Sequence, residues 1–139
     1  MSYLLDICVL SELTKPTPEK RVVQWLSNQA DQQLYLSVVT VGELRRGVLR
    51  LPPSRKKNRL DQWLNTLLIQ YQDRILLFDT DTAESWAQIT TAALQQGRPL
   101  ALADSYIAAT AVQHKLGLVT RNVTDFQAVT LNISNPWEL

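Results

Sequence analysis

Four acidic residues are the part of this sequence most able to do chemistry, because each lies at or just after the end of an apolar segment. They are Asp6 after residues 3–5, Glu43 after residues 34–41, Asp104 after residues 100–103 and Asp125 after residues 118–121. In a parallel α/β sheet, the carboxyl ends of neighbouring strands meet at one edge, and ligands bind there. Acids that are far apart in the sequence are therefore expected to meet at one point.

Carboxylates that meet repel one another, and burial strengthens the repulsion, so such a group needs a cation. Mg²⁺ and Mn²⁺ are the hard cations that prefer oxygen ligands and keep open positions for water. The four acids therefore predict a metal site of the kind that hydrolyses phosphodiester bonds.

The composition is that of one ordinary globular domain covering residues 1–139, with 45% apolar and 19% charged residues. A single cysteine, Cys8, and a single histidine exclude an internal disulfide, a cysteine-based zinc site and a histidine-rich site. The N-terminus has no basic region or long apolar run, and no segment is as long as a membrane span. We therefore expect a cytoplasmic protein with no membrane partner.

Positive charge is concentrated in residues 45–59, which hold seven of the 14 lysines and arginines and no acid. One interpretation is a solvated connection between two helices. The other is a surface that contacts phosphates or an acidic partner, because crowded like charges are unfavourable unless an anion is near. The candidate contact residues are Arg46, Arg50, Arg55, Lys56 and Lys57.

Short apolar strands alternate with helical patterns, which predicts an α/β fold with a parallel sheet of about five short strands and helices on both faces. Thr40 and Glu43 have capping-box spacing, Gly97 and Pro99 end a helix, and Gly117 is expected to follow the C-terminus of another. The expected strands cover residues 3–5, 34–37, 75–78, 118–120 and 129–133, and the expected helices cover residues 9–13, 19–30, 40–50, 55–71, 82–96 and 103–115.

Each acid also has a purely structural interpretation. Asp6 could cap a helix, Glu43 could complete the capping box, Asp104 could favour a helix dipole and Asp125 could lie in a turn. Asp81, three residues before Glu84, is expected to cap the next helix, which explains the pair Asp79 and Asp81, and helix-dipole interaction explains His114. The functional interpretation gains weight only because the four acids can converge on one sheet edge.

The order of the motifs resembles the PIN-domain family, and within it the VapC-type toxins of bacterial toxin–antitoxin pairs, including the FitB-like branch. The resemblance covers essentially the whole chain. The motifs are Tyr3-Leu4-Leu5-Asp6, Ser11-Glu12-Leu13, residues 36–44, residues 104–111, residues 118–126 and Asn135-Pro136-Trp137.

This resemblance implies a PIN-like parallel sheet, an endoribonuclease that depends on Mg²⁺ or Mn²⁺, inhibition by a small DNA-binding antitoxin, and a homodimer. Asp6, Glu43 and Asp104 match the three core acids of the family, and Asp6 and Asp104 are the expected metal ligands. Either Asp125 or Asn122 fills the fourth position. Hydrolysis would leave the 2′-hydroxyl of the RNA out of the chemistry, with Thr120 and Ser11 positioning water or phosphate.

The sequence departs from the family at Ile7-Cys8, where Thr-Asn is usual. The asparagine is expected to orient the acids by hydrogen bonding, and a thiol is a weak donor. Cys8 therefore favours the alternative of a weakened or inactive module that binds its antitoxin and RNA. A phosphotransfer domain of the receiver type is disfavoured, because Asp6 stands alone after the first strand and Arg121 takes the place of a late lysine.

Overall fold

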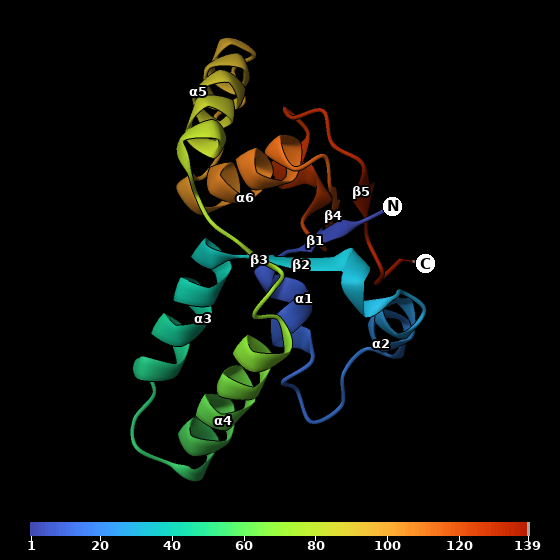
Figure 1. The fold of residues 1–139 in the computed structure, drawn as a ribbon, viewed down its shortest axis with the longest axis vertical. Coiled ribbons are helices and arrows are strands. Elements are labelled where there is room, and N and C mark those ends of the chain that lie inside the picture. The colour runs from blue at the N-terminus through green and yellow to red at the C-terminus, as the bar shows by residue number, and fades with distance from the viewer. Residues whose placement is uncertain (139) are drawn as a thin grey trace.

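Five short parallel strands form one sheet with the order β3-β2-β1-β4-β5 (Figure 1). The computed structural model describes residues 1–138. The chain moves outward from β1 through β2 to β3 and then returns to the other side of β1 to form β4 and β5. The strands are β1 (Tyr3–Leu5), β2 (Leu34–Ser37), β3 (Ile75–Leu76), β4 (Gly117–Val119) and β5 (Ile133–Ser134).

Helices cover both faces of this sheet, as the alternating pattern predicts (Figure 1). Helices α1 to α4 lie on one side, and α6 lies on the other with α5 packed against it. The Trp86 Nε1 atom of α5 donates a hydrogen bond to Ser105 Oγ of α6 at 2.9 Å. The helices are α1 (Ile7–Glu12), α2 (Lys20–Ser27), α3 (Val38–Leu49), α4 (Arg55–Gln70), α5 (Thr80–Gln95) and α6 (Leu102–Gln113), with 3₁₀ helices η1 (Asp31–Gln33) and η2 (Val123–Phe126).

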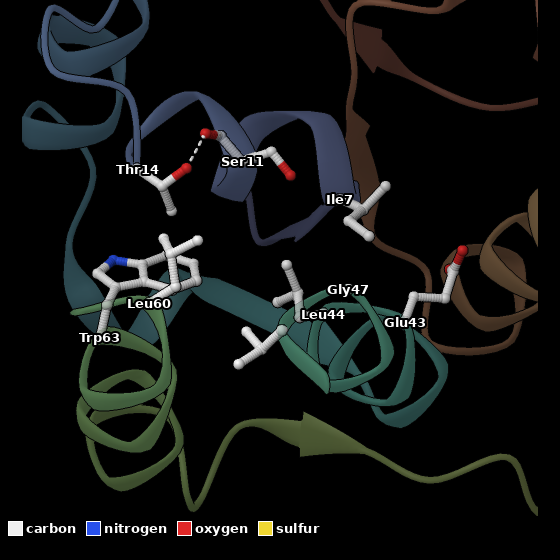
Figure 2. A pocket seen from close by; sticks show the side chains of 9 residues that line it. Ile7, Ser11, Thr14, Glu43, Leu44, Gly47, Leu60 and Trp63 are labelled. Atoms are coloured by element: carbon white, nitrogen blue, oxygen red, sulfur yellow. Dashed lines mark hydrogen bonds between the residues drawn. The ribbon is translucent and has the colours of Figure 1, made fainter. Parts of the chain in front are cut away.

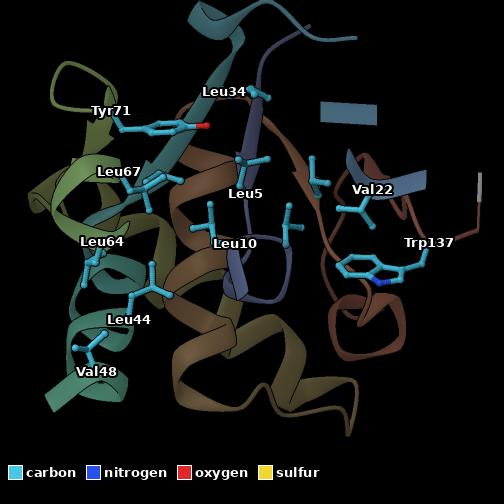
Figure 3. Packing of buried hydrophobic residues seen from close by; sticks show 13 residues of the cluster. Leu5, Leu10, Val22, Leu34, Leu44, Val48, Leu64, Leu67, Tyr71 and Trp137 are labelled. Carbon is cyan, nitrogen blue, oxygen red and sulfur yellow. The ribbon is translucent and has the colours of Figure 1, made fainter. Parts of the chain in front are cut away.

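Two apolar clusters hold these layers together, because successive strand residues point to opposite faces of the sheet. Leu4 packs with Ile107 of α6, whereas Leu5 packs with Leu10 of α1 and Leu64 of α4. Figure 3 shows the second cluster extending from the α3–α4 pair to Trp137 near the C-terminus. Full burial of one such side chain contributes about 1.5–3 kcal/mol, so the strand ends are firmly placed.

The start of α3 differs from the expected capping box. Ser37 is the N-cap residue, and its hydroxyl accepts a hydrogen bond from Val39 N at 3.1 Å. Thr40 lies inside the helix, fully buried, and its hydroxyl has no partner among residues 1–138. The capping-box interpretation of Glu43 is therefore wrong, because β2 passes directly into α3 without a connecting loop.

The end of α6 also differs from expectation. Gly117 belongs to β4, and Lys115, with φ of 55°, is the residue in the left-handed conformation. A Cβ atom at Gly117 would lie 3.0 Å from Tyr3 Cδ1. The glycine therefore serves the close approach of β4 to β1, and the predicted C′ role is wrong.

In the part of the chain that the structure describes, none of the helices combines the length and the apolar character needed to cross a bilayer.

Candidate active site

Asp6 and Thr120 meet where the strand order reverses, between β1 and β4. Asp6 directly follows β1 and is 4% exposed, and Thr120 directly follows β4 and is fully buried. Thr120 Oγ1 donates a hydrogen bond to Asp6 Oδ2 at 2.8 Å, and Asp6 Oδ1 accepts one from Ile7 N at 2.9 Å. This reversal point is where α/β sheets bind ligands, so the fold places a fixed carboxylate there.

Cys8 lies in the same hydrogen-bond network. Its Sγ atom is 3.8 Å from Asp6 Oδ2 and 3.6 Å from Thr120 Oγ1, and it accepts a hydrogen bond from Arg121 N at 3.5 Å. Burial raises the pKa of the thiol, so Cys8 stays protonated and donates only weakly. The structure thus puts Cys8 beside the Asp6 carboxylate, at the position where an orienting side chain would act.

Asp104 occupies the first turn of α6 and is the acid whose pKa is shifted most. Burial raises its pKa from the usual 3.8 to about 6, with further contributions from the negative charges of Asp6, Asp125 and Glu43. The four acids predicted from the sequence are therefore near enough for their charges to act on one residue. Such a perturbed carboxyl group in a cleft is typical of a functional site.

Glu43 approaches this region from α3 and is partly buried. Burial raises its pKa, the charge of Asp6 raises it further, and Arg46 lowers it. Figure 2 shows Glu43 at one end of an apolar cavity, with Trp63 at the other end. Because Glu43 does not cap α3, its carboxylate is available to a ligand.

The predicted supporting residue Ser11 lines that same cavity, which has a volume of about 180 Å³ between α1, α3 and α4. The carbonyl of Ser11 accepts a hydrogen bond from the Thr14 hydroxyl at 2.7 Å (Figure 2). Ser11 itself is exposed. The structure thus places Ser11 with Glu43, on the side of the site that α3 forms.

Asp125 and Asn122 both belong to the segment around η2, and both are exposed. Asn122 N donates a hydrogen bond to Thr120 Oγ1 at 3.0 Å, so its backbone supports the residue that binds Asp6. Asp125 acts on Asp104 through its charge. Asp125 therefore shares an electrostatic site with the other acids, whereas the role seen for Asn122 is that of its backbone.

The donors of this site suit a hard divalent cation, because they are carboxylate oxygens at an open edge and their charges are unbalanced. Within residues 1–138, no three His, Cys, Asp or Glu side chains lie close enough together to enclose a metal ion. Asp6 and Asp104 are the two acids best suited to bind such a cation. Asp6 is oriented by hydrogen bonds from Ile7 N and Thr120 Oγ1, and the negative charge of Asp104 is unfavourable without a cation.

The basic residues singled out in the sequence lie on the α3–α4 pair, away from β1. Lys57 is half-buried, and the other four candidates are exposed. A sixth basic residue, Arg45, pairs with Asp61 and donates a hydrogen bond to Asn65 Oδ1 at 2.6 Å, which ties α3 to α4. Part of the basic stretch is thus structural, and its exposed part is Arg46, Arg50, Arg55, Lys56 and Arg59.

The residues interpreted as structural have that role. Asp79 is the N-cap of α5, and its carboxylate accepts hydrogen bonds from both the backbone N and the hydroxyl of Thr82 at 2.9 Å. The hydrogen bond from Thr82 N lowers the pKa of Asp79. His114 is the C-cap residue of α6. The cap is Asp79 rather than the expected Asp81, which occupies the first turn.

Sequence reasoning missed a polar hollow of about 470 Å³ beside two of the acids. It is lined by Arg98, Pro99, Ala101, Asp104, Thr124, Asp125, Gln127 and Ala128. The sequence offered one usable signal, which is Arg98. It lies between Gly97 and Pro99, which end α5, and it precedes Asp104 in the first turn of α6. Gly97 and Pro99 indicate only a helix stop, and nothing in their spacing predicts where the side chain of Arg98 lies.

A family model described as PIN domain matches residues 3–130. This chain belongs to the PIN-domain family. It is similar to Toxin FitB of Neisseria gonorrhoeae, with 44% identity over 96% of this chain and 97% of that protein. It is also similar to the VapC ribonuclease Y4jK of Sinorhizobium fredii, with 40% identity over 97% of each protein.

The fold matches a crystal structure of FitAcB from Neisseria gonorrhoeae with a TM-score of 0.94 and 44% identity, covering 99% of both chains. A toxin–antitoxin complex from Klebsiella pneumoniae contains a chain of the same fold, with a TM-score of 0.73 and 29% identity over 99% of this chain and 100% of that chain. The predicted FitB-like and VapC-like resemblance and the predicted α/β fold are both confirmed.

Proposed function

We propose that this protein is the toxin of a toxin–antitoxin pair, an endoribonuclease that hydrolyses RNA phosphodiester bonds and is inhibited by its cognate antitoxin. The observation that supports this proposal most is the raised pKa of Asp104, which is caused first by burial and then by the charges of Asp6, Asp125 and Glu43. Relatives with 40–44% identity that are named as a toxin and as a ribonuclease support it. Such a toxin would act in the cytoplasm.

In the proposed reaction, Asp6 and Asp104 would hold Mg²⁺ or Mn²⁺, with Glu43 and Asp125 around them. When bound, such a cation supplies an activated water and offsets negative charge on the phosphate oxygens. Thr120 keeps the Asp6 carboxylate oriented through its 2.8 Å hydrogen bond. Burial and the charge of Asp6 raise the pKa of Glu43, which suits this residue to accept a proton from the attacking water.

A cleavage assay on single-stranded RNA tests the proposal. With Mg²⁺ or Mn²⁺ the purified protein should cut RNA, and a chelator should stop the reaction. Addition of the antitoxin encoded beside the toxin should also stop it. Intact RNA under all metal conditions, with a folded protein, would overturn the proposal.

The alternative function is a weakened PIN-like module that mainly binds its antitoxin and RNA. The geometry of Cys8 favours it, because the thiol lies 3.8 Å from Asp6 Oδ2 and cannot fix that oxygen as an amide would. The same assay separates the two functions. A module would bind the antitoxin tightly and leave RNA intact.

The five candidate basic residues on and around α3 and α4 are proposed to contact RNA or the antitoxin, namely Arg46, Arg50, Arg55, Lys56 and Lys57. Reversal of Arg55, Lys56 and Lys57 to Glu should weaken RNA binding and reduce its salt dependence. Loss of three phosphate contacts would lower the slope of log K against log salt by about 2 for single-stranded RNA. An unchanged slope together with weaker capture of the antitoxin would assign these residues to the antitoxin instead.

A homodimer is also proposed. Three large apolar side chains around α5 and α6 are more than 60% exposed, namely Leu77, Leu94 and Leu102. Light scattering of the purified toxin should give twice the mass of one 15.8 kDa chain. A monomeric mass would contradict the dimer without affecting the proposed chemistry.

A further inference from the structure

The hollow beside Asp104 and Asp125 has two walls of different origin. One wall is the connection from α5 to α6, which contributes Arg98, and the other is the segment around η2. The hollow opens directly onto two of the four acids. A ligand in this hollow therefore lies next to acids that take part in the proposed chemistry.

Arg98 is held firmly at the end of α5. Gly97 takes the left-handed conformation with φ of 70°, Gly97 N donates to Leu94 O at 3.0 Å, and Arg98 N donates to Ala93 O at 2.9 Å. This pair of hydrogen bonds is the Schellman motif, and Pro99 then fixes the next φ angle. The backbone of Arg98 is thus set by local geometry, and its side chain lines the hollow.

Arg98 forms no ion pair within the part of the chain that the structure describes. The ion pairs there are those of Lys15, Arg21 and Arg45. Arg98 is exposed and has no side-chain hydrogen bond to another residue in 1–138. A guanidinium that faces a hollow without a protein partner is suited to an anionic ligand, and phosphate oxygens match its geometry best.

The opposite wall of the hollow is held in place by a buried side chain. Phe126, the last residue of η2, is fully buried in the cluster that contains Leu4 and Ile107. Thr124 and Gln127, on either side of that anchor, line the hollow with a hydroxyl and an amide. Such groups can form hydrogen bonds with the edge of an unpaired base, which is how single-stranded RNA is usually recognised.

We propose that this hollow binds the RNA nucleotide next to the bond that is cut, and that Arg98 contacts the phosphate of that nucleotide. This proposal rests on the proposed ribonuclease function. The acids repel RNA phosphates, so the hollow needs a positive charge on its far wall, and Arg98 is the cation that lines it. Thr124 and Gln127 then contact the base, and Arg98 binds any sequence equally.

The test compares Arg98→Gln and Arg98→Lys with the native protein. Lys115→Gln is the matched control. Lys115 is exposed and lies just before β4, at the amino ends of the strands, whereas the acids lie at their carboxyl ends. Binding of a fluorescent single-stranded oligoribonucleotide is measured by anisotropy in chelator at graded salt, and cleavage is measured with Mg²⁺. Melting curves verify that each variant is folded.

Arg98→Gln should weaken binding about tenfold, which is about 1.4 kcal/mol, because it removes a charge-assisted contact to a phosphate. Its salt slope should fall by about 0.7, the value for one phosphate contact in single-stranded RNA. The KM should rise with kcat unchanged, and Arg98→Lys should keep the native salt slope. Lys115→Gln should match the native protein.

Equal binding and equal salt slopes for Arg98→Gln and Lys115→Gln, with a native protein that cleaves RNA, would overturn this subsite and leave the ribonuclease function standing. A native salt slope with weaker antitoxin binding would also overturn it and assign Arg98 to the antitoxin. A native protein that neither binds nor cleaves RNA would overturn the proposed function, and the subsite with it.

Discussion

Glu12 and Asp104 are two carboxylates in opposite electrostatic situations. The side chain of Glu12, at the end of α1, is 6% exposed, and its oxygens accept hydrogen bonds from Lys15 Nζ at 2.9 Å and from Glu19 N at 3.0 Å. The hydrogen bond from Lys15 is the main reason that its pKa is lowered. Asp104 has a raised pKa because it is buried near other acids.

The difference shows how one residue type serves the fold in one place and chemistry in another. Glu12 has its charge balanced inside the protein, and in doing so it fastens the connection between α1 and α2. The charge of Asp104 is left unbalanced at an open edge, which is unfavourable for the protein alone. An unbalanced group of acids is therefore best explained by a cation or substrate that comes from outside.

The largest expected effect is on cleavage. Asp104→Asn should remove RNA cleavage and growth inhibition, because it removes a proposed metal ligand, and the metal-free fold should keep or gain stability as repulsion is relieved. Asp81→Asn is the matched control, because Asp81 lies in the first turn of α5. Full activity of Asp104→Asn with Mg²⁺ would remove Asp104 from the site.

The next effect concerns Cys8, which adjoins both Asp6 and Thr120. Loss of a side chain that orients a metal ligand typically costs 10–100-fold in affinity or activity. Cys8→Asn should therefore raise Mg²⁺-dependent cleavage by about this factor, whereas Cys8→Ala should change little. If native protein and Cys8→Asn are both inert with either metal, the binding-module function becomes the better one.

On the structural side, Glu12→Ala should lower the free energy of unfolding by about 1–3 kcal/mol, because it leaves the backbone N–H of Glu19 without its partner. Chemical denaturation measures this loss. The metal affinity of the folded variant should stay native. A stable variant with weakened metal binding would place Glu12 in the site and erase the contrast with Asp104.

The smallest expected effect is on the pH dependence of stability. Its sign differs between Asp104 and Glu12. Because the pKa of Asp104 is raised in the folded state, the metal-free protein should gain stability as the pH falls from about 6 to about 4. The lowered pKa of Glu12 means that its contribution is present above the usual glutamate pKa and is lost as the pH falls through the folded value.

Melting curves in chelator at several pH values measure both effects. Asp104→Asn should lack the gain between about pH 6 and pH 4. Glu12→Gln should lack the loss at lower pH. A native pH profile in Asp104→Asn would mean that another group titrates in this range.

The sequence predicted the strands that surround the site well, because β1, β2 and β4 are short apolar segments that end at or directly before a polar residue. It also predicted the position of Asp6, since a strand end in a parallel sheet is a fixed place. Expectations failed where tertiary packing decides. Gly117 pairs with β1 rather than ending α6, and Ser37 caps α3 because β2 has no loop after it.

The positions of the candidate acids in the fold could be predicted from the sequence, whereas the residues that surround them could not. Acids at strand ends give a local signal that can be interpreted from spacing alone. The hollow lined by Arg98 is formed by segments about 26 residues apart, so only the fold brings them together. Likewise, nothing near Glu12 in the sequence indicates that its partner would be the backbone of Glu19.

The central claim is that the acids bind a divalent cation, and a thermal melt with Mn²⁺ tests it most directly. A cation bound only by the folded state should stabilise the native protein by about 2.7 kcal/mol at roughly 100 times the dissociation constant. The double variant Asp6→Asn, Asp104→Asn should show a much smaller shift, and Asp81→Asn should keep the native shift. Equal shifts in the native protein and in the double variant would contradict the account.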